Sequence, residues 1–168
     1  PRGKFLKAFL IALFLVAVCV YPALANGQKH QANRWQGLVT HVSDGDTLWV
    51  QPDHGRDAVK IRIDGIDAPE ICQAWGPESR AALAARVLRQ RVSVRARAHD
   101  KYGRVIASVV LHDGNAGGAD DVGQWQVQGG HAWANQFRHY KSRYGASQAQ
   151  AQSERRGLWA AARPCPPR

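Results

Sequence analysis

The chain has 168 residues and a formal charge of +10 at pH 7, with 45% hydrophobic and 21% charged residues. This length is enough for one domain with a real core and too short for two comfortable ones. A basic balance favours a polyanionic partner, either nucleic acid or an anionic membrane face, although Lys and Arg could also merely keep an exported protein soluble. Charge therefore narrows the class of partner without deciding it.

The first 25 residues have the pattern of a bacterial-type signal peptide. A positive region precedes an almost wholly apolar run, residues 9 to 20, and a small-x-small motif ends at Ala25. We expect cleavage after Ala25, export to the periplasm or the outside of the cell, and no stable membrane association afterwards. The alternative is a membrane anchor, but the apolar run falls short of the roughly 20 residues that a span needs. The positive residues are Arg2, Lys4 and Lys7, and their removal leaves +7 of the +10 charge.

Cys72 and Cys165 would then stand in an oxidising space, where disulfides persist. We hypothesise that they pair, and free-thiol titration of the unfolded, unreduced protein tests this. Neither has a second Cys or His at zinc-ligand spacing, so a zinc site is not expected.

Residues 26–35 are polar and without periodicity, which predicts a flexible leader, with folded structure starting near Gln36. Period-two alternation after Gln36 predicts three antiparallel strands in a meander. Lys60 and Arg62 share one face of the third strand, opposite its core residues. The expected strands are 37–43, 47–50 and 59–63, joined by the Asp44-Gly45 turn and a second turn at 53–57.

The second half mixes strands and helices. Pro77 and Glu78 mark the start of a helix that runs to Gln90, and Asp121 can cap a short helix that ends at Gly129-Gly130. Five short strands with helices beside them predict an α+β, mainly β, small closed barrel, of which the five-stranded nucleic-acid-binding version is the OB-fold. The other expected elements are strands 92–97 and 105–111, a loose loop 115–120, and a polar helix from Ser147 to Trp159.

Two carboxylates, two arginines and one glutamate could form a phosphodiester-cleaving site. Asp46 follows its turn glycine, so the turn does not need it. Asp46 and Asp67 both lie at the end of an expected strand, beside a turn, and such carboxylates can bind hard cations such as Ca²⁺. Arg62 and Arg104 can offer paired N–H donors to a phosphate. Glu70 has no structural role that the sequence explains. Taken one by one, these residues could equally be turn or surface residues.

Their order along the chain resembles the staphylococcal nuclease (thermonuclease) family over about residues 36 to 160. The resemblance implies an OB barrel with three helices as a nuclease domain, followed by a tail at 161–168. The motifs that carry it are Asp44-Gly45-Asp46-Thr47, Arg62, Asp67-Ala68-Pro69-Glu70, Asp100-Lys101-Tyr102-Gly103-Arg104, and Ser147 to Trp159.

The resemblance also implies roles. Asp46, Asp67 and the backbone carbonyl of Ala68 would bind Ca²⁺, with Asp44 and Thr47 around them. Glu70 would act as general base or orient the attacking water. The catalytic arginines would be Arg62 and Arg104, and the substrate-binding residues would be Lys101, Tyr102 and, by base stacking, Trp133, Phe137 or Tyr140.

Two departures from the family pattern stand out. The loop from Ile71 to Trp75 is short, and the base-stacking tyrosines of the family have no clean match. Trp133 could therefore be a core residue instead of a stacking residue.

The implied protein is an exported, Ca²⁺-dependent and monomeric nuclease that cuts DNA and RNA and leaves 3′-phosphates. Its rival is an OB module that binds nucleic acid without cleaving it. A histidine-based phospholipase-D-type site is excluded, because Ile106 and Ala146 stand where its two motifs need aspartate.

Overall fold

The structure is a computed structural model that describes residues 33–55, 57–112, 119–135 and 142–160. The expected signal peptide, most of the leader and the tail lie outside these ranges, as do Phe137, Tyr140 and Cys165. Within them, no helix is both long and apolar enough to cross a membrane.

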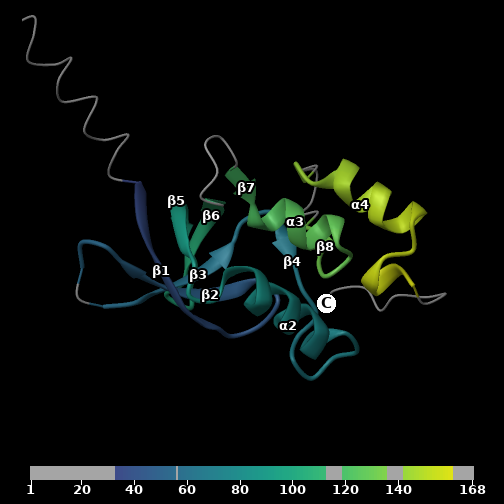
Figure 1. Cartoon of the computed structure of the whole chain (residues 1–168), viewed down its shortest axis with the longest axis horizontal. Coiled ribbons are helices and arrows are strands. Elements are labelled where there is room, and N and C mark those ends of the chain that lie inside the picture. Colours follow the sequence, from purple (N-terminus) through teal and green to yellow (C-terminus); the bar gives the residue numbers. More distant parts are fainter. Residues whose placement is uncertain (1–32, 56, 113–118, 136–141, 161–168) are drawn as a thin grey trace, which may run out of the picture. The chain divides into compact units, whose positions relative to one another are not determined.

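Five strands form a closed barrel, as the sequence predicted (Figure 1). Their hydrogen-bonded order is β3-β2-β1-β5-β6, and the barrel closes where β3 pairs with β6 in parallel. With three helices beside it, this is the expected mainly-β OB-fold. The strands are β1 (Arg34–Val42), β2 (Thr47–Pro52), β3 (Val59–Ile63), β5 (Arg91–His99) and β6 (Val105–His112).

The core lies inside the barrel because alternate strand residues point inward. The two strands next to the site, β2 and β3, pair with Thr47 opposite Arg62 and Trp49 opposite Lys60. These four side chains therefore belong to the outer face. The fully buried residues between them are Leu48, Val50, Ile61 and Ile63.

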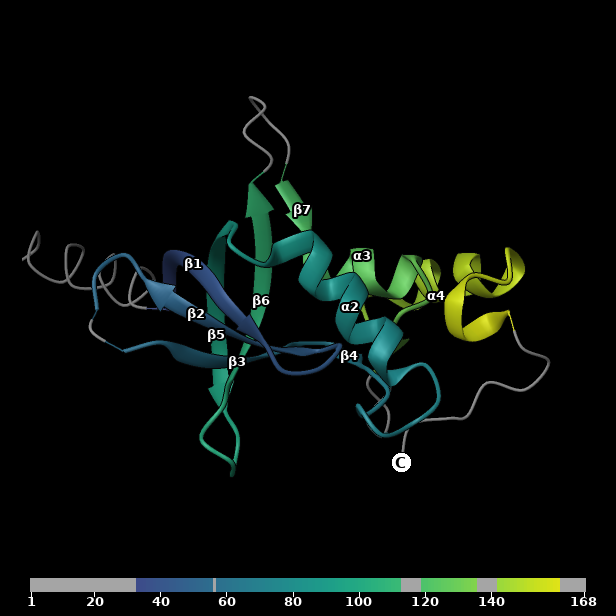
Figure 2. The same ribbon diagram turned by 60° about the horizontal axis from the view of Figure 1, so that its bottom comes forward.

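Three helices lie to one side of the barrel (Figures 1 and 2). They are α2 (Gly76–Val87), α3 (Val122–Gln128) and α4 (Gly145–Ser153). Helix α3 contacts β6, α2 and α4, and of the three helices α4 lies farthest from the five barrel strands in both views. Asp121 caps α3 as expected, accepting a hydrogen bond from the Gln124 amide at 3.1 Å.

Helix α2 ends at Val87, earlier than the predicted Gln90. Leu88 is extended and Arg89 has a φ of 62°. The chain turns there because the Arg89 amide donates to the Val39 carbonyl, which draws it toward β1. Tertiary pairing thus overrides the helical propensity of this segment.

Helix α4 is also shorter than the predicted span of Ser147 to Trp159. It ends at Ser153, and a short 3₁₀ helix, Gly157–Trp159, follows. Gly157 has a φ of 49°, and a Cβ there would lie 2.2 Å from the Gly130 carbonyl oxygen. Two glycines therefore allow a backbone-to-backbone contact that ends the helix and fixes the 3₁₀ turn against the end of α3.

Three short strands complete the fold. β7 (Ala119–Asp121) pairs with β6 in the segment expected to be a loose loop. β4 (Ile66–Asp67) and β8 (Trp133–Ala134) form a separate antiparallel pair. Also, β1 begins at Arg34, before the expected start near Gln36.

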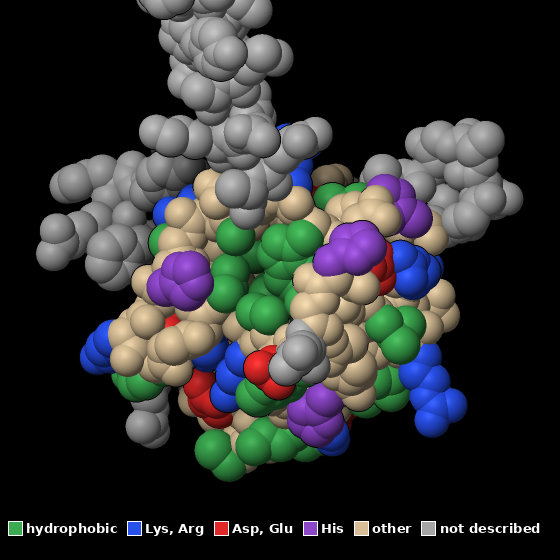
Figure 3. All heavy atoms as spheres, turned by 90° about the vertical axis from the view of Figure 1, so that its left-hand side faces the viewer, with side chains coloured by type: hydrophobic (Ala, Val, Ile, Leu, Met, Phe, Trp, Pro, Cys, Tyr) green, Lys and Arg blue, Asp and Glu red, His purple; other side chains and the backbone are tan. Residues whose placement is uncertain are grey.

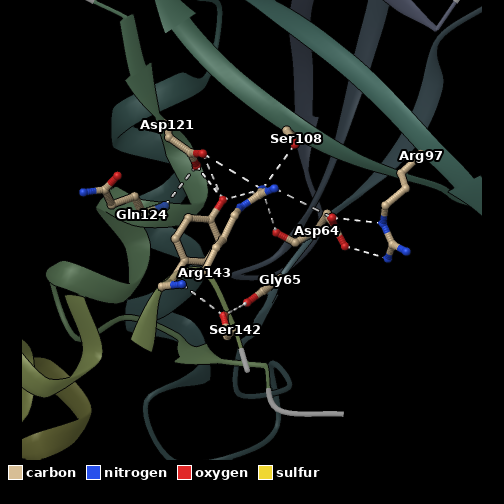
Figure 4. A network of polar contacts seen from close by, with 9 residues as sticks. Asp64, Gly65, Arg97, Ser108, Asp121, Gln124, Ser142 and Arg143 are labelled. Atoms are coloured by element: carbon tan, nitrogen blue, oxygen red, sulfur yellow. Dashed lines mark hydrogen bonds and ion pairs between the residues drawn. The ribbon is translucent and has the colours of Figure 1, made fainter. Parts of the chain in front are cut away.

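A polar cluster, here called the Arg143 clasp, ties the residues before α4 to the barrel (Figure 4). Asp64 accepts two hydrogen bonds from Arg97, at 3.0 and 2.7 Å. The Nη2 of Arg143 donates to the Asp64 carbonyl at 3.3 Å and to the Tyr144 hydroxyl at 2.5 Å. The Tyr144 hydroxyl in turn donates to Asp121 at 2.8 Å. The clasp thus joins the end of β3, β5, the N-terminus of α3 and the chain before α4.

Candidate active site

Asp46 lies in the turn between β1 and β2 and is 6% exposed. Its Oδ1 accepts a hydrogen bond from the Thr47 hydroxyl at 2.9 Å, and its Oδ2 accepts one from the Ala68 amide at 3.1 Å. Burial raises the pKa of Asp46 to about 7, with Asp44 adding to the rise and Arg62 opposing it. A carboxylate so placed needs more positive charge than this pocket supplies.

Arg62 joins the two predicted metal ligands. Its Nη2 lies 2.6 Å from Asp67 Oδ1 and 3.3 Å from Asp46 Oδ2, and its Nη1 donates to the Ile66 carbonyl at 3.1 Å. Burial also raises the pKa of Asp67, against the effect of Arg62 and with that of Glu70. Residues from the β1–β2 turn, β3 and β4 therefore meet at one guanidinium.

Arg104 reaches the same network from the turn after β5. Its Nε donates to Asp100 at 2.7 Å, and its Nη1 lies 3.4 Å from the Thr47 hydroxyl, which itself donates to Asp46. Both predicted arginines are thus linked to Asp46, one directly and one through Thr47. Asp100, which sequence reasoning treated only as part of a turn, orients Arg104.

Glu70 is exposed, and no hydrogen bond or ion pair with a described residue involves its carboxylate. Its backbone is fixed instead. The Glu70 amide donates to the Gln73 side chain at 2.8 Å, and a Cβ on Gly76 would lie 2.0 Å from the Glu70 carbonyl oxygen. The short loop that follows therefore holds the glutamate in place while its carboxylate stays available beside Asp67.

Gln126 and Ser79 support the turn that carries Asp46, and sequence reasoning missed both. Gln126 is fully buried in α3, and its Nε2 donates to the Gly45 carbonyl at 2.7 Å. A Cβ on Gly45 would lie 1.8 Å from the Ser79 hydroxyl of α2, so only glycine fits there. No sequence signal separates Gln126 from Gln124 and Gln128 in the same helix.

The predicted substrate-binding residues differ in how exposed they are. Tyr102 is 71% exposed, and the cationic groups of Lys101 and Arg104 lie 5.1 and 5.5 Å from its ring centroid. Trp133 is only 7% exposed, and its backbone pairs with Asp67 in β8. That burial favours the core alternative for Trp133, which leaves no open ring face for a base. Cys72 is exposed.

The residues present fit a hard divalent cation. Besides burial, Asp44 raises the pKa of Asp46, Glu70 and Asp44 raise that of Asp67, and Arg62 is the cation that opposes both rises. Oxygen donors and an excess of negative charge suit Ca²⁺. Among the described residues no three His, Cys, Asp or Glu side chains cluster as a metal site.

The surface charge does not by itself mark a binding site. On the face shown in Figure 3, Lys and Arg side chains are scattered among acidic, histidine and hydrophobic side chains. The formal charge of +10 is therefore not gathered into one basic field on that face.

Comparison with known proteins agrees with the geometry. A model of the staphylococcal nuclease homologue family matches residues 60–161, a range that includes Arg62, Asp67, Glu70 and Arg104. An uncharacterized endonuclease of Escherichia coli is 36% identical over 131 residues, covering 78% of this chain and 81% of that protein. A micrococcal nuclease of Shigella flexneri is 32% identical over 166 residues, covering 92% of this chain and 88% of that protein. The chain belongs to the staphylococcal nuclease homologue family.

Proposed function

We propose that this protein is a Ca²⁺-dependent nuclease that hydrolyses phosphodiester bonds of DNA and RNA. The observation that carries the proposal is the continuous network from Arg104 through Thr47, Asp46 and Arg62 to Asp67, with the unengaged Glu70 carboxylate beside it. Six side chains from separate segments of the chain converge there. The names of the relatives, an endonuclease and a micrococcal nuclease, support the same chemistry.

The two arginines supply fixed positive charge for a phosphate. Phosphodiester cleavage builds negative charge on the phosphate oxygens, and guanidinium donors held in place before the reaction stabilise that charge. Arg62 is anchored by the Ile66 carbonyl and two carboxylates, and Arg104 by Asp100. Neither side chain must reorganise far to meet a substrate.

Glu70 is the group positioned to handle a proton. Its exposed carboxylate can accept a proton from the attacking water, or orient that water by hydrogen bonding, for in-line displacement. The water oxygen would bond to phosphorus as the bond from phosphorus to the 5′-oxygen breaks, and the leaving oxygen would take up a proton, which leaves a 3′-phosphate and a 5′-hydroxyl. When bound by Asp46, Asp67 and the Ala68 carbonyl, the Ca²⁺ ion would polarise the phosphate and neutralise part of its charge.

The proposal includes where the protein works. Export after cleavage at Ala25 would place it in the periplasm or outside the cell, where Ca²⁺ is abundant enough for a site with few protein ligands. It would act there as a monomer. The mass of the mature protein, starting at Asn26, and its elution volume in size-exclusion chromatography test these two points.

The test is cleavage of single-stranded DNA and of RNA with Ca²⁺ or with excess chelator. Glu70→Gln should slow cleavage by about 10²–10⁴-fold. Glu78→Gln is the matched control, because Glu78 is an exposed residue of the first turn of α2. Equal rates with and without chelator, or in the two variants, would contradict the proposal. Binding without cleavage in any divalent metal would identify a silent nucleic-acid-binding module.

A further inference from the structure

The outer face of β2 and β3 continues past the candidate active site. Thr47 and Arg62, which belong to the network, are direct partners across the two strands, and the next outward pair is Trp49 and Lys60. Residues two apart on a strand point to the same side and are about 6.8 Å apart. A second pair of side chains thus stands beside the arginine that would meet the phosphate.

This second pair combines an aromatic ring and a positive charge. The Nζ of Lys60 lies 5.7 Å from the centroid of the Trp49 ring, and both residues are partly exposed. The core does not require either side chain, since Leu48, Val50 and Ile61 fill the interior between them. His41, the exposed partner of Trp49 on β1, continues the row on the other side.

The charge of Lys60 is not taken up by a described carboxylate. On β5, by contrast, Arg91 and Arg97 form ion pairs with Asp53 and Asp64. A contact between an ammonium group and an exposed ring is weak, and the flexible Lys stem can move its charge to a nearby phosphate. Lys60 is therefore available to an anionic ligand, and its movement would uncover the Trp49 ring.

We propose that Trp49 and Lys60 form a subsite for the second nucleotide from the scissile phosphate in a single-stranded substrate. The base would stack on Trp49 and its phosphate would contact Lys60. The distance of about 6.8 Å from the Thr47–Arg62 pair is about twice the ~3.4 Å rise per base along one strand. The proposal rests on the proposed function, because it takes Arg62 as the site of the reacting phosphate.

The test compares a 12-residue oligothymidylate with a dinucleotide, which is too short to occupy both places. Binding is measured on the Glu70→Gln background, so that the oligonucleotide stays intact. We expect Trp49→Leu to weaken binding of the 12-mer about tenfold, within the range that loss of one stacked base produces, and to leave dinucleotide binding unchanged. Trp49→Phe should restore most of the affinity, because it keeps a ring.

Lys60→Gln should weaken 12-mer binding and reduce its salt dependence by roughly 0.7 in the log–log slope. Arg155→Gln is the charge-matched control, since Arg155 is exposed in the turn after α4 and away from this face. In the enzyme with intact Glu70, Trp49→Leu should raise KM for the 12-mer and leave kcat unchanged. A melting curve checks that each variant is folded.

Equal affinity of the wild-type and Trp49→Leu proteins for the 12-mer would overturn the proposal. So would an equal loss for both oligonucleotides, because that would show a general effect on the site. If either result is obtained while Ca²⁺-dependent cleavage is intact, only the subsite proposal is rejected and the proposed function stands. Absence of cleavage in the wild-type protein would instead remove the proposed function.

Discussion

Two clusters of Asp and Arg side chains in this fold differ in their charge balance. In the active-site network, Asp46 and Asp67 are joined by Arg62, while the further carboxylates Asp44 and Glu70 raise the pKa of one or both of them. In the Arg143 clasp, two aspartates meet two arginines and a tyrosine hydroxyl (Figure 4). The active-site network comprises Asp44, Asp46, Arg62, Asp67, Glu70, Thr47 and Arg104, and the clasp Asp64, Arg97, Asp121, Arg143 and Tyr144.

Burial makes this difference matter. The Asp46 and Arg62 side chains are 9% and 19% exposed, whereas Arg97 and Arg143 in the clasp are 63% and 45% exposed. An unbalanced charge costs most where water cannot reach it. The unbalanced charge in the active-site network thus destabilises the fold, and a bound cation and substrate can offset this. In the clasp, the charges are already paired with one another or hydrated, so the clasp is a structural connection.

The largest expected difference between the clusters is in activity. Arg62→Gln should lower kcat by about 10³-fold or more, because it removes fixed charge from the reacting phosphate. Arg97→Gln removes the same charge from the clasp and should leave kcat within about twofold of wild type. Initial rates on single-stranded DNA with saturating Ca²⁺ measure both. Similar losses in the two variants would mean that the clasp takes part in catalysis.

The next expected difference is in stability: replacing Asp by Asn should have opposite effects on the free energy of unfolding in the two clusters. Asp46→Asn should raise the free energy of unfolding by on the order of 1–3 kcal/mol, because it removes a buried charge whose pKa is raised to about 7. The lost hydrogen bond from the Ala68 amide reduces the gain. Asp64→Asn should lower the free energy of unfolding by about 0.5–1 kcal/mol, since it weakens contacts to two exposed arginines.

Urea unfolding at pH 8 with excess chelator measures this pair of variants. Asp46→Asn should also abolish most of the Ca²⁺-dependent cleavage, so that one substitution increases stability and reduces activity. Destabilisation by Asp46→Asn would show that Arg62 fully compensates the charge of Asp46. The two clusters would then not differ in the way proposed.

The sequence predicted the barrel because its strands alternate clearly. Ile61 and Ile63 inside and Arg62 outside follow from period two alone. Asp46, Arg62, Asp67 and Arg104 were likewise chosen from their order along the chain, and the structure brings them together. The alternation of residues and the order of the family motifs along the chain are therefore enough to predict the barrel and these four site residues.

The residues that support the site and the ends of the helices depend on contacts between distant segments. Nothing in the local sequence indicates that Gln126 would bind the Gly45 carbonyl from 81 residues away. The early ends of α2 and α4 have the same origin, because backbone contacts at Val39 and Gly130 compete with the helical conformation. Positioning residues and helix ends are thus set by tertiary structure that periodicity does not encode.

The smallest expected effect concerns the clasp hydroxyl. Tyr144 is 3% exposed, and its hydroxyl accepts from Arg143 and donates to Asp121. Tyr144→Phe keeps the ring and removes both contacts, so we expect a loss of about 1–2 kcal/mol at pH 7 and unchanged kcat. This corresponds to a fall in Tm of roughly 3–8 °C.

The pH dependence identifies the hydroxyl as the cause. Burial and the hydrogen bond to Asp121 raise the pKa of Tyr144, so the folded state disfavours the phenolate. This contribution is complete below the ordinary tyrosine pKa of about 10 and is lost as the pH rises above it. Wild-type protein should therefore lose its advantage over Tyr144→Phe as the pH rises from about 10 to about 12. If the Tm difference stayed constant over that range, packing of the Tyr144 ring would stabilise the clasp and its hydroxyl contacts would not. The clasp would then resemble the active-site network only in its residue types.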